Sequence, residues 1–165
     1  LGVSVLRFAT LFGAGVHTFY TRIFSHRVVP VLLGYDPLVQ LLHPDDALDA
    51  VAAVLAKGPS GVVNIVPRDT LTLRTALHLS DKLTVSVPHL AAYPGAELWW
   101  GMGIGEAPAG FIDYVRYLFV ADGEKARREL GFEPRHTSRE ALTAFLEYRY
   151  PEAAARAREV QEAGT

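Results

Sequence analysis

The hydrophobic pattern is clearest over residues 41–66, where two apolar runs flank a helical stretch. Leu41-Leu42 ends at His43-Pro44, and Asp45 then stands where an N-cap accepts from the free N–H groups of a first turn. Gly58 suits the left-handed position after a helix. This order predicts a β-α-β unit, which is typical of a mainly parallel sheet covered by helices. The helix is expected to bury one apolar stripe, formed by Leu48, Val51, Ala52 and Leu55.

Shorter apolar and β-branched runs predict further strands, and capped periodic stretches predict further helices. The run at 3–6 is expected to be a buried strand because it carries few polar side chains. The other expected strands cover residues 28–33, 39–42 and 83–87, and the expected helices cover 17–27, 88–102 and 122–130. A further helix is expected to run through Ser80 with Thr70 or Thr72 as its cap, and a last helix is expected to be capped by Ser138.

Composition limits the class of protein. The chain has 165 residues, half of them hydrophobic, which favours one domain with a real core. The net charge of −2 gives no reason to expect nucleic acid. The absence of cysteine excludes disulfides and thiolate metal sites, and the histidines show no zinc-ligand spacing. Residues 1–150 are expected to form the domain and residues 151–165 a charged, alanine-rich tail.

Two features of the N-terminal end affect the interpretation. The chain starts at Leu1 and enters a strand pattern at once, which predicts that it is a piece of a longer protein. No signal-peptide pattern and no apolar run of membrane-spanning length occurs, so a cytoplasmic location is expected.

Three segments, in this order, resemble the C-terminal half of an extended short-chain dehydrogenase/reductase of the NAD-dependent epimerase/dehydratase group. Residues 6–13 (Leu-Arg-Phe-Ala-Thr-Leu-Phe-Gly) resemble the strand and loop after the catalytic segment of that family. Residues 40–47 resemble its turn of a hydrophobic residue, His, any residue and Asp-Asp that leads into a helix. Residues 122–134 resemble its closing helix and its Leu-Gly-aromatic-x-Pro turn.

The resemblance implies a fold and an activity. The expected fold is α/β, namely the last part of a Rossmann-type parallel sheet plus the smaller, mixed α/β substrate-binding lobe. The expected function is the substrate-binding part of an NAD(P)-dependent epimerase, dehydratase or reductase, with NAD or NADP bound by the longer protein. The missing N-terminal Rossmann half is the expected partner, and a homodimer is possible. A non-catalytic relative that serves as a binding or assembly subunit is the alternative.

The catalytic parts of that family are absent from this chain. The residues four positions before the three lysines are Ala53, His78 and Ala121, so no Tyr-x-x-x-Lys pair occurs and no catalytic residue is predicted. Gly13-Ala14-Gly15 imitates a dinucleotide fingerprint, but Thr18 stands where the third glycine belongs, which favours an ordinary turn.

His43 lies beside Asp45 and Asp46, which allows acid–base chemistry, although helix capping already explains these residues. Arg7, at the strand end, is expected to form a structural ion pair.

Site residues are carried over from the family by position. The resemblance implies that Phe8, Ala9 and Thr10 lie against the nicotinamide. It implies that the substrate cleft is bordered by His17, Leu33 and Gln40. The aromatic stretch over residues 93–119, which has few charges and includes Trp99 and Trp100, is expected to form an apolar lid over that cleft. For that stretch, a lobe core or a subunit contact is the alternative to an apolar lid.

The expected substrate is not a nucleotide sugar. Family members that act on nucleotide sugars resemble one another in holding the diphosphate with arginines. At the two corresponding positions this chain has Val39 and Ile112, although Arg116 lies close to the second. Apolar side chains there would desolvate a diphosphate at a cost, so an uncharged, largely apolar small molecule is expected.

Overall fold

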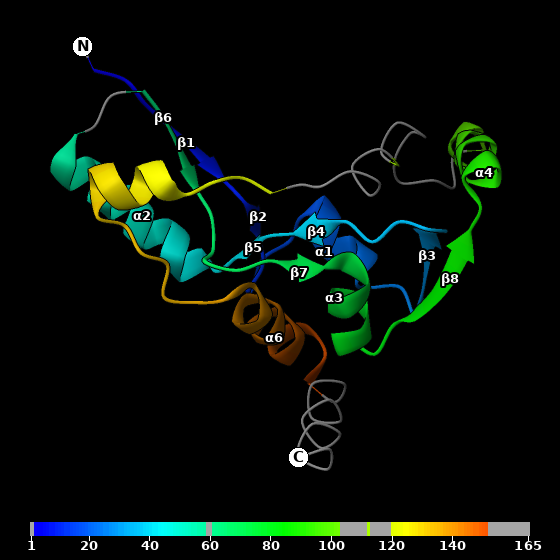
Figure 1. The fold of residues 1–165 in the computed structure, drawn as a ribbon. Coiled ribbons are helices and arrows are strands. Elements are labelled where there is room, and N and C mark those ends of the chain that lie inside the picture. The colour runs from blue at the N-terminus through cyan, green and yellow to red at the C-terminus, as the bar shows by residue number, and fades with distance from the viewer. Residues whose placement is uncertain (1, 59–60, 103–111, 113–119, 152–165) are drawn as a thin grey trace.

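Two short parallel ladders form the backbone of the first half of the molecule (Figure 1). The computed structural model describes residues 2–58, 61–102, 112 and 120–151. Strand β1 (Ser4–Phe8) pairs with β6 (Gly61–Ile65), and β2 (Thr10–Leu11) pairs with β5 (Leu41–Leu42). Because β2 follows β1 after one residue, the two ladders continue one another, which confirms the predicted mixed α/β architecture with parallel pairing.

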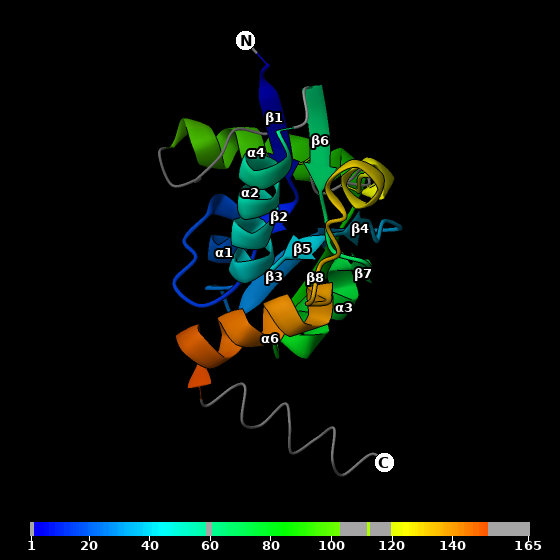
Figure 2. The same cartoon turned by 90° about the vertical axis from the view of Figure 1, so that its left-hand side faces the viewer.

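Helix α2 (Pro44–Lys57) connects β5 to β6, and Figure 2 shows it running beside β1 and β6. Gly58 ends it in the left-handed conformation, as predicted. The predicted cap was wrong, because His43 is the N-cap: its Nδ1 accepts from the Asp45 N–H at 3.2 Å.

The predicted buried stripe of α2 was wrong as well. Leu48 is 67% exposed and Leu55 81% exposed, whereas Asp46 and Ala50 are buried completely. The helix is rotated so that its small side chains face β6, because a buried contact of the Asp46 carboxylate fixes its orientation. Alanines at the contact also let the helix lie close to the sheet. The partly buried residues beside Ala50 are Ala47, Ala53 and Val54.

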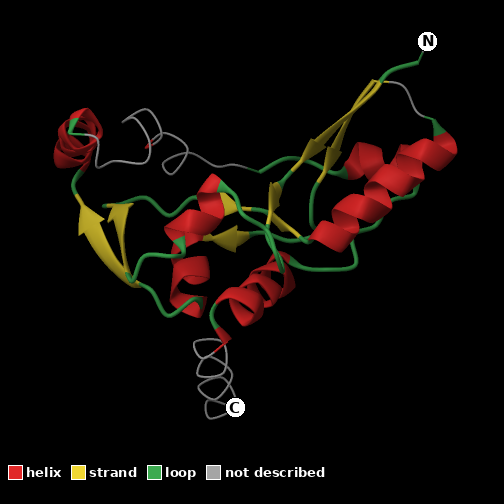
Figure 3. Ribbon diagram, turned by 180° about the vertical axis from the view of Figure 1, so that it is seen from behind, coloured by secondary structure: helices red, strands yellow, loops and turns green. Residues whose placement is uncertain are grey.

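The second half of the molecule is a lobe built on two further ladders. One ladder is parallel and the other antiparallel, so the lobe is mixed. Figure 3 shows helices and strands together in this molecule. Most of its elements lie where they were predicted, although the first helix is much shorter than the expected 17–27. The lobe contains α1 (Phe19–Ile23), β3 (Val28–Leu32) paired with β8 (Leu83–Val87), β4 (Leu38–Val39) paired with β7 (Leu71–Thr72), α3 (Leu73–Leu79) and α4 (His89–Gly101).

Two hydrophobic clusters form the core. In the first, the rings of Phe24 and Phe145 lie edge-on against Phe12, each with its centre 5.3 Å away. The second joins Val63 and Ile65 of β6 to Ala126, Leu130 and Phe132. The C-terminal elements that close these clusters are the π-helical turn η2 (Ala126–Leu130) and helix α6 (Ser138–Arg149).

The C-terminal elements correct two details of the prediction. Residues 122–130 were expected to be one regular helix, but their last turn is π-helical before Gly131 ends it in the left-handed conformation. The predicted cap Ser138 is the first residue inside α6, and Thr137 caps the helix instead. Ser138 is fully buried because its hydroxyl accepts from the Leu41 N–H at 3.2 Å and so joins α6 to β5.

Strand β1 is much less buried than predicted. The side chains of Val3 and Val5 are 66% and 45% exposed, and Arg7 is exposed, without an ion pair among the described residues. Within the described part of the chain, β1 has one strand neighbour, β6. Its other edge therefore presents backbone polar groups next to apolar side chains. Among those residues, no helix combines the length and apolar character needed to cross a membrane.

We predict that the free edge of β1 makes the isolated chain associate. An open edge next to exposed valines is a template for further pairing. Light scattering over a range of concentrations should show a mass that rises with concentration. Val5→Lys should raise the concentration needed for association about tenfold, equivalent to about 1.4 kcal/mol, because a lysine blunts an edge.

Thr143→Lys, which adds the same charge on an exposed position of α6, serves as the control and should leave association unchanged. A monomer at every concentration, with a cooperative melt, would contradict this prediction.

Candidate functional site

The end of β1 is a point where the chain changes strand partners. Phe8 is paired with Ile65 of β6, and Thr10 with Leu41 of β5. Between them, the Ala9 N–H donates to the Ile65 carbonyl at 2.9 Å. Strands that diverge at their carboxyl ends leave a crevice in which α/β proteins bind their ligands. Phe8 is 38% exposed at this position, so its ring is partly available to a ligand.

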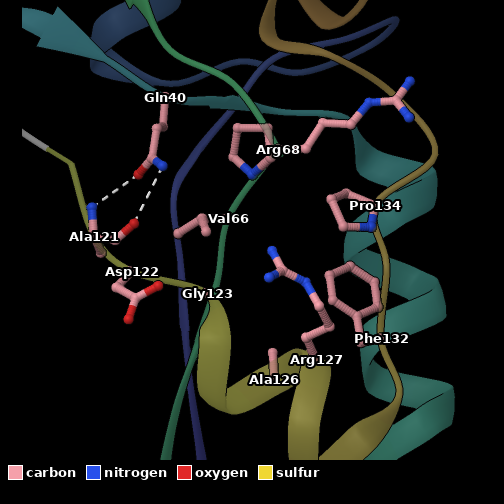
Figure 4. Close-up of a pocket in the computed structure, with 11 residues that line it drawn as sticks. Gln40, Val66, Arg68, Ala121, Asp122, Gly123, Ala126, Arg127, Phe132 and Pro134 are labelled. Carbon is pink, nitrogen blue, oxygen red and sulfur yellow. Dashed lines mark hydrogen bonds between the residues drawn. The ribbon is translucent and has the colours of Figure 1, made fainter.

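A hollow of about 160 Å³ lies at the carboxyl end of β6, next to this junction (Figure 4). It is smaller than the roughly 300–1,000 Å³ of ordinary ligand pockets. On its own it therefore accommodates a small group, not a dinucleotide. The lining residues are Gln40, Val66, Pro67, Arg68, Ala121, Asp122, Gly123, Ala126, Arg127, Phe132 and Pro134.

The amide of Gln40 is occupied by backbone. Its Oε1 accepts from the Ala121 N–H at 2.8 Å, and its Nε2 donates to the Ala121 carbonyl at 3.2 Å (Figure 4). Asn64 of β6 adds a bond to the neighbouring peptide group, from Nδ2 to the Asp122 carbonyl at 3.2 Å. Gln40 is buried, so its first role in this structure is to hold residues 121–122 against the sheet.

The charged groups that line the hollow are all engaged. Arg127 pairs with Glu124 at 2.7 Å, and Arg68 donates to the Arg135 carbonyl at 3.2 Å. The Asp122 carboxylate accepts from the Glu124 N–H at 2.9 Å. Positive and negative charges therefore balance, and the hollow has no strong preference for an anion.

The other predicted substrate residues lie in the lobe. His17 is exposed just before α1, and Leu33 is 56% exposed where its N–H donates to the Val87 carbonyl. Trp100 is 48% exposed near the end of α4, which also contains Trp99. Figure 1 shows β3, β8 and α4 at the opposite end of the molecule from β1 and β6. The predicted site residues thus form two groups, and none of the lobe residues lines the hollow.

A cluster of charged and imidazole groups surrounds the N-terminus of α2. Its centre is Asp46, whose Oδ1 and Oδ2 accept the backbone N–H groups of Arg135 and His136 at 2.9 and 3.0 Å. Arg135 also pairs with Asp49 at 2.6 Å. The ring of His136 stacks on His43, with ring centres 4.0 Å apart. These contacts favour the structural interpretation of the aspartates over acid–base catalysis.

The imidazoles of this cluster are unequal. Burial lowers the pKa of His43, and the neighbouring His136 ring lowers it further, although Asp45 and Asp46 act in the opposite direction. His136 Nδ1 is buried 3.2 Å from Asp46 Oδ1 and yet makes no aligned hydrogen bond.

A metal ion suits this cluster poorly. Ligand atoms of His43, Asp45 and His136 lie within 4.8 Å of one another. However, the stacked rings direct their lone pairs along parallel planes, and the Nδ1 of His43 already accepts the Asp45 N–H. Coordination of one ion by both rings would break the stack and the helix cap.

Gly13 owes its identity to the same region. A Cβ atom at Gly13 would lie 2.5 Å from Cδ of Pro44, so the loop after β2 needs glycine to pack on the start of α2. Gly15 has a positive φ of 74°. A packed turn therefore explains both glycines without a dinucleotide.

Sequence reasoning missed the residues that hold the C-terminal segment in place. These include Asn64, and Asp69, whose carboxylate accepts from the Ser138 N–H at 2.6 Å. No local signal marks them, because their partners lie more than 50 residues away along the chain.

Comparison with known proteins places this arrangement. No family model matches the chain. Uncharacterized proteins of Mycobacterium tuberculosis and Mycobacterium bovis are 30% identical over 146 residues, which is 88% of this chain and 39% of each relative. The chain therefore spans about two fifths of the length of these curated relatives.

Solved structures match over most of the chain. MoeE5 in complex with UDP-glucuronic acid and NAD is 22% identical with a TM-score of 0.62, over 89% of this chain and 46% of that one. UDP-glucose 4-epimerase from Thermotoga maritima, with UDP-glucose, is 22% identical with a TM-score of 0.61, over 88% and 45%. UDP-glucuronic acid 4-epimerase from Bacillus cereus is 13% identical with a TM-score of 0.62, over 90% and 45%.

The chain has the fold of the C-terminal part of an extended short-chain dehydrogenase/reductase. That fold is what the three sequence segments implied, with β1, β2, β5 and β6 as sheet strands and β3, β4, β7 and β8 as the lobe. At these identities the likeness establishes the fold, and the activity is a separate question.

We predict that Asp46→Asn destabilises the chain by about 1–3 kcal/mol, since the new amide cannot accept both backbone N–H groups and leaves a buried donor unsatisfied. Urea unfolding followed by circular dichroism measures the loss. Asp49→Asn, which removes an exposed pair with the same arginine, should cost less than about 1 kcal/mol. An equal loss of unfolding free energy in the two variants would show that the buried Asp46 carboxylate stabilises the fold no more than the exposed Asp49 carboxylate does.

Proposed function

We propose that the chain is the substrate-binding, sheet-completing C-terminal portion of an NAD(P)-dependent epimerase, dehydratase or reductase. The observation that carries the proposal is the fold: solved neighbours match this chain over 45–48% of their own length. Several of them were solved with NAD. The free edge of β1 also suits further strands from an N-terminal Rossmann half. We also propose that this enzyme is cytoplasmic.

In the longer protein, the N-terminal Rossmann half and this chain would have different roles in catalysis. NAD or NADP, when bound, supplies hydride transfer. In this chain, the partly exposed ring of Phe8 and the small side chain of Ala9 lie at the partner switch, a place that suits the flat face of a nicotinamide. Thr10 completes that edge. These residues would position the cofactor ring and exclude water, and the proton-transfer pair would come from residues outside this chain.

The substrate we propose is uncharged and largely apolar. Val39 is half-buried in β4, opposite Leu71, where it packs against the first core cluster. Ile112 is half-buried, and Arg116 lies outside the described residues. Neither Val39 nor Ile112 therefore offers a guanidinium group to a diphosphate. The solved neighbours named above hold UDP-sugars, so this is a specific departure from them.

The alternative is a relative that has lost catalysis and acts as a binding or assembly subunit. The residues encoded before Leu1 discriminate between the two. A glycine-rich loop and a Tyr-x-x-x-Lys pair support the enzyme, and their absence supports the binding protein.

We predict that the chain alone binds NADH or NADPH weakly, with a dissociation constant of about 1 mM or higher. It contains no phosphate loop, and its hollow is small. A protein extended by the residues encoded upstream should bind at micromolar concentration. Calorimetric titration of both proteins measures the difference. In the extended protein, Phe8→Ala should weaken binding about tenfold, a loss of about 1.4 kcal/mol.

Val5→Ala, on the same strand and similarly exposed, is the matched control and should bind as the parent does. Low-micromolar binding of NADH or NADPH by the chain alone, a binding free energy of about −8 kcal/mol, would refute the assignment. It would instead favour a dinucleotide site at Gly13-Ala14-Gly15.

We also predict that the extended protein oxidises or reduces apolar alcohols or carbonyls in preference to nucleotide sugars. A panel of UDP-sugars, GDP-sugars, steroids, acyl alcohols and isoprenoid alcohols, read by cofactor absorbance, tests this. Turnover of a nucleotide sugar with kcat/KM above about 10⁴ M⁻¹s⁻¹, the range of true substrates, would disprove the assignment of Val39 and Ile112.

A further inference from the structure

Two imidazole rings close the contact between the start of α2 and the turn that precedes α6. The rings of His43 and His136 are stacked, with centres 4.0 Å apart and planes inclined by 24°. The side chain of His43 is 15% exposed and that of His136 31% exposed. The stack is thus shielded, but protons from water can reach it.

The acidic groups around the stack outnumber the basic ones. Asp45 lies 3.6 Å from His43 Nδ1, and the buried Asp46 carboxylate lies 3.2 Å from His136 Nδ1. Arg135 adds a positive charge next to both rings and is itself paired with Asp49. Two further charged groups belong to this region, Arg68, which is bonded to the Arg135 carbonyl, and Glu140, which is held in the capping box of Thr137.

Protonation of His43 at Nδ1 would remove the cap of α2, because this nitrogen would lose the lone pair that accepts the Asp45 N–H. With one ring neutral, the stack is a favourable contact between flat surfaces. With both rings protonated, two positive charges would face one another beside the Arg135 guanidinium. The Asp46 carboxylate, 3.2 Å from His136 Nδ1, offsets one of these charges, but it does not restore the lost cap.

We propose that the stack of His43 and His136 is a pH-sensitive clamp. It holds residues 134–137 against α2 at neutral pH and releases them in mildly acid solution. Pro134 and the nearby Phe132 line the hollow at the end of β6, so release would loosen one wall of that hollow.

The titration of His43 agrees with this direction. Its pKa in the folded chain is lowered, chiefly by burial and next by the His136 ring. Above the ordinary pKa of histidine, the neutral ring of His43 therefore stabilises the closed contact. This stabilisation is lost as the pH falls through the lowered pKa of His43. Helix caps made by serine or threonine have no such dependence.

Hydrogen exchange of the Arg135 and His136 amides tests the clamp, since both donate to Asp46. Protection, corrected for intrinsic exchange, should fall about tenfold in the unmodified chain between about pH 7.5 and about pH 5, the range in which histidine changes charge. The Phe12 amide, bonded to the Leu42 carbonyl, should keep its protection and so report that the rest of the fold is intact.

His136→Phe keeps a flat ring but removes one of the two charges from the stack, so protection should fall less than in the unmodified chain. His26→Phe changes an exposed histidine elsewhere and should behave as the unmodified chain does. Unchanged protection in the unmodified chain, an equal fall in His136→Phe, or a parallel fall at Phe12 would each overturn the proposal.

If His136→Phe does not fold, a proton NMR titration of the two rings in the unmodified chain gives the answer. Loss of amide protection must follow the protonation of His43. Loss while His43 is still neutral would overturn the clamp.

Discussion

The buried carboxylate of Asp46 is the contact on which the two ends of this chain depend. It lies in the first turn of α2 and accepts two backbone N–H groups from residues almost 90 positions further along. A buried carboxylate is costly unless its oxygens are satisfied. The helix must therefore present this face inward, and the turn at 135–136 must stay where its N–H groups reach the oxygens. The same contact thus fixes both the orientation of α2 and the path of the C-terminal segment.

This constraint explains why a helix pattern was located correctly but oriented wrongly. The sequence around Asp46 predicts a helix with a glycine end, because capping and periodicity are local properties. Which face lies inward depends on donors at Arg135 and His136, which no local pattern contains. Leu48 and Leu55 form the more hydrophobic stripe, yet Ala50 lies against the sheet because the carboxylate needs that side.

The candidate site shows the same division. The sequence segment at 6–13 indicated a strand and its end, because an apolar strand followed by glycine implies a strand end. It could not show that Gln40 is bonded to Ala121, a residue 81 positions away. An amide that donates and accepts toward one peptide group is a structural connection, and only the folded chain brings the two together. Gln40 therefore acts first on the backbone beside the hollow.

One part of the molecule buries most of its apolar side chains, whereas another part leaves several of them exposed. The aromatic cluster around Phe12 involves the lobe and α6, and it contains no residue of β1 or α2. The cluster around Val63 depends on β6 and α2, beside which Val5 and Leu55 remain exposed. Regions with fewer buried contacts open at lower free energy. The β1–β6 end should thus be the less stable one, and that is also the end where the chain changes strand partners. A ligand or a neighbouring domain that binds there would stabilise the part of the fold that most needs it.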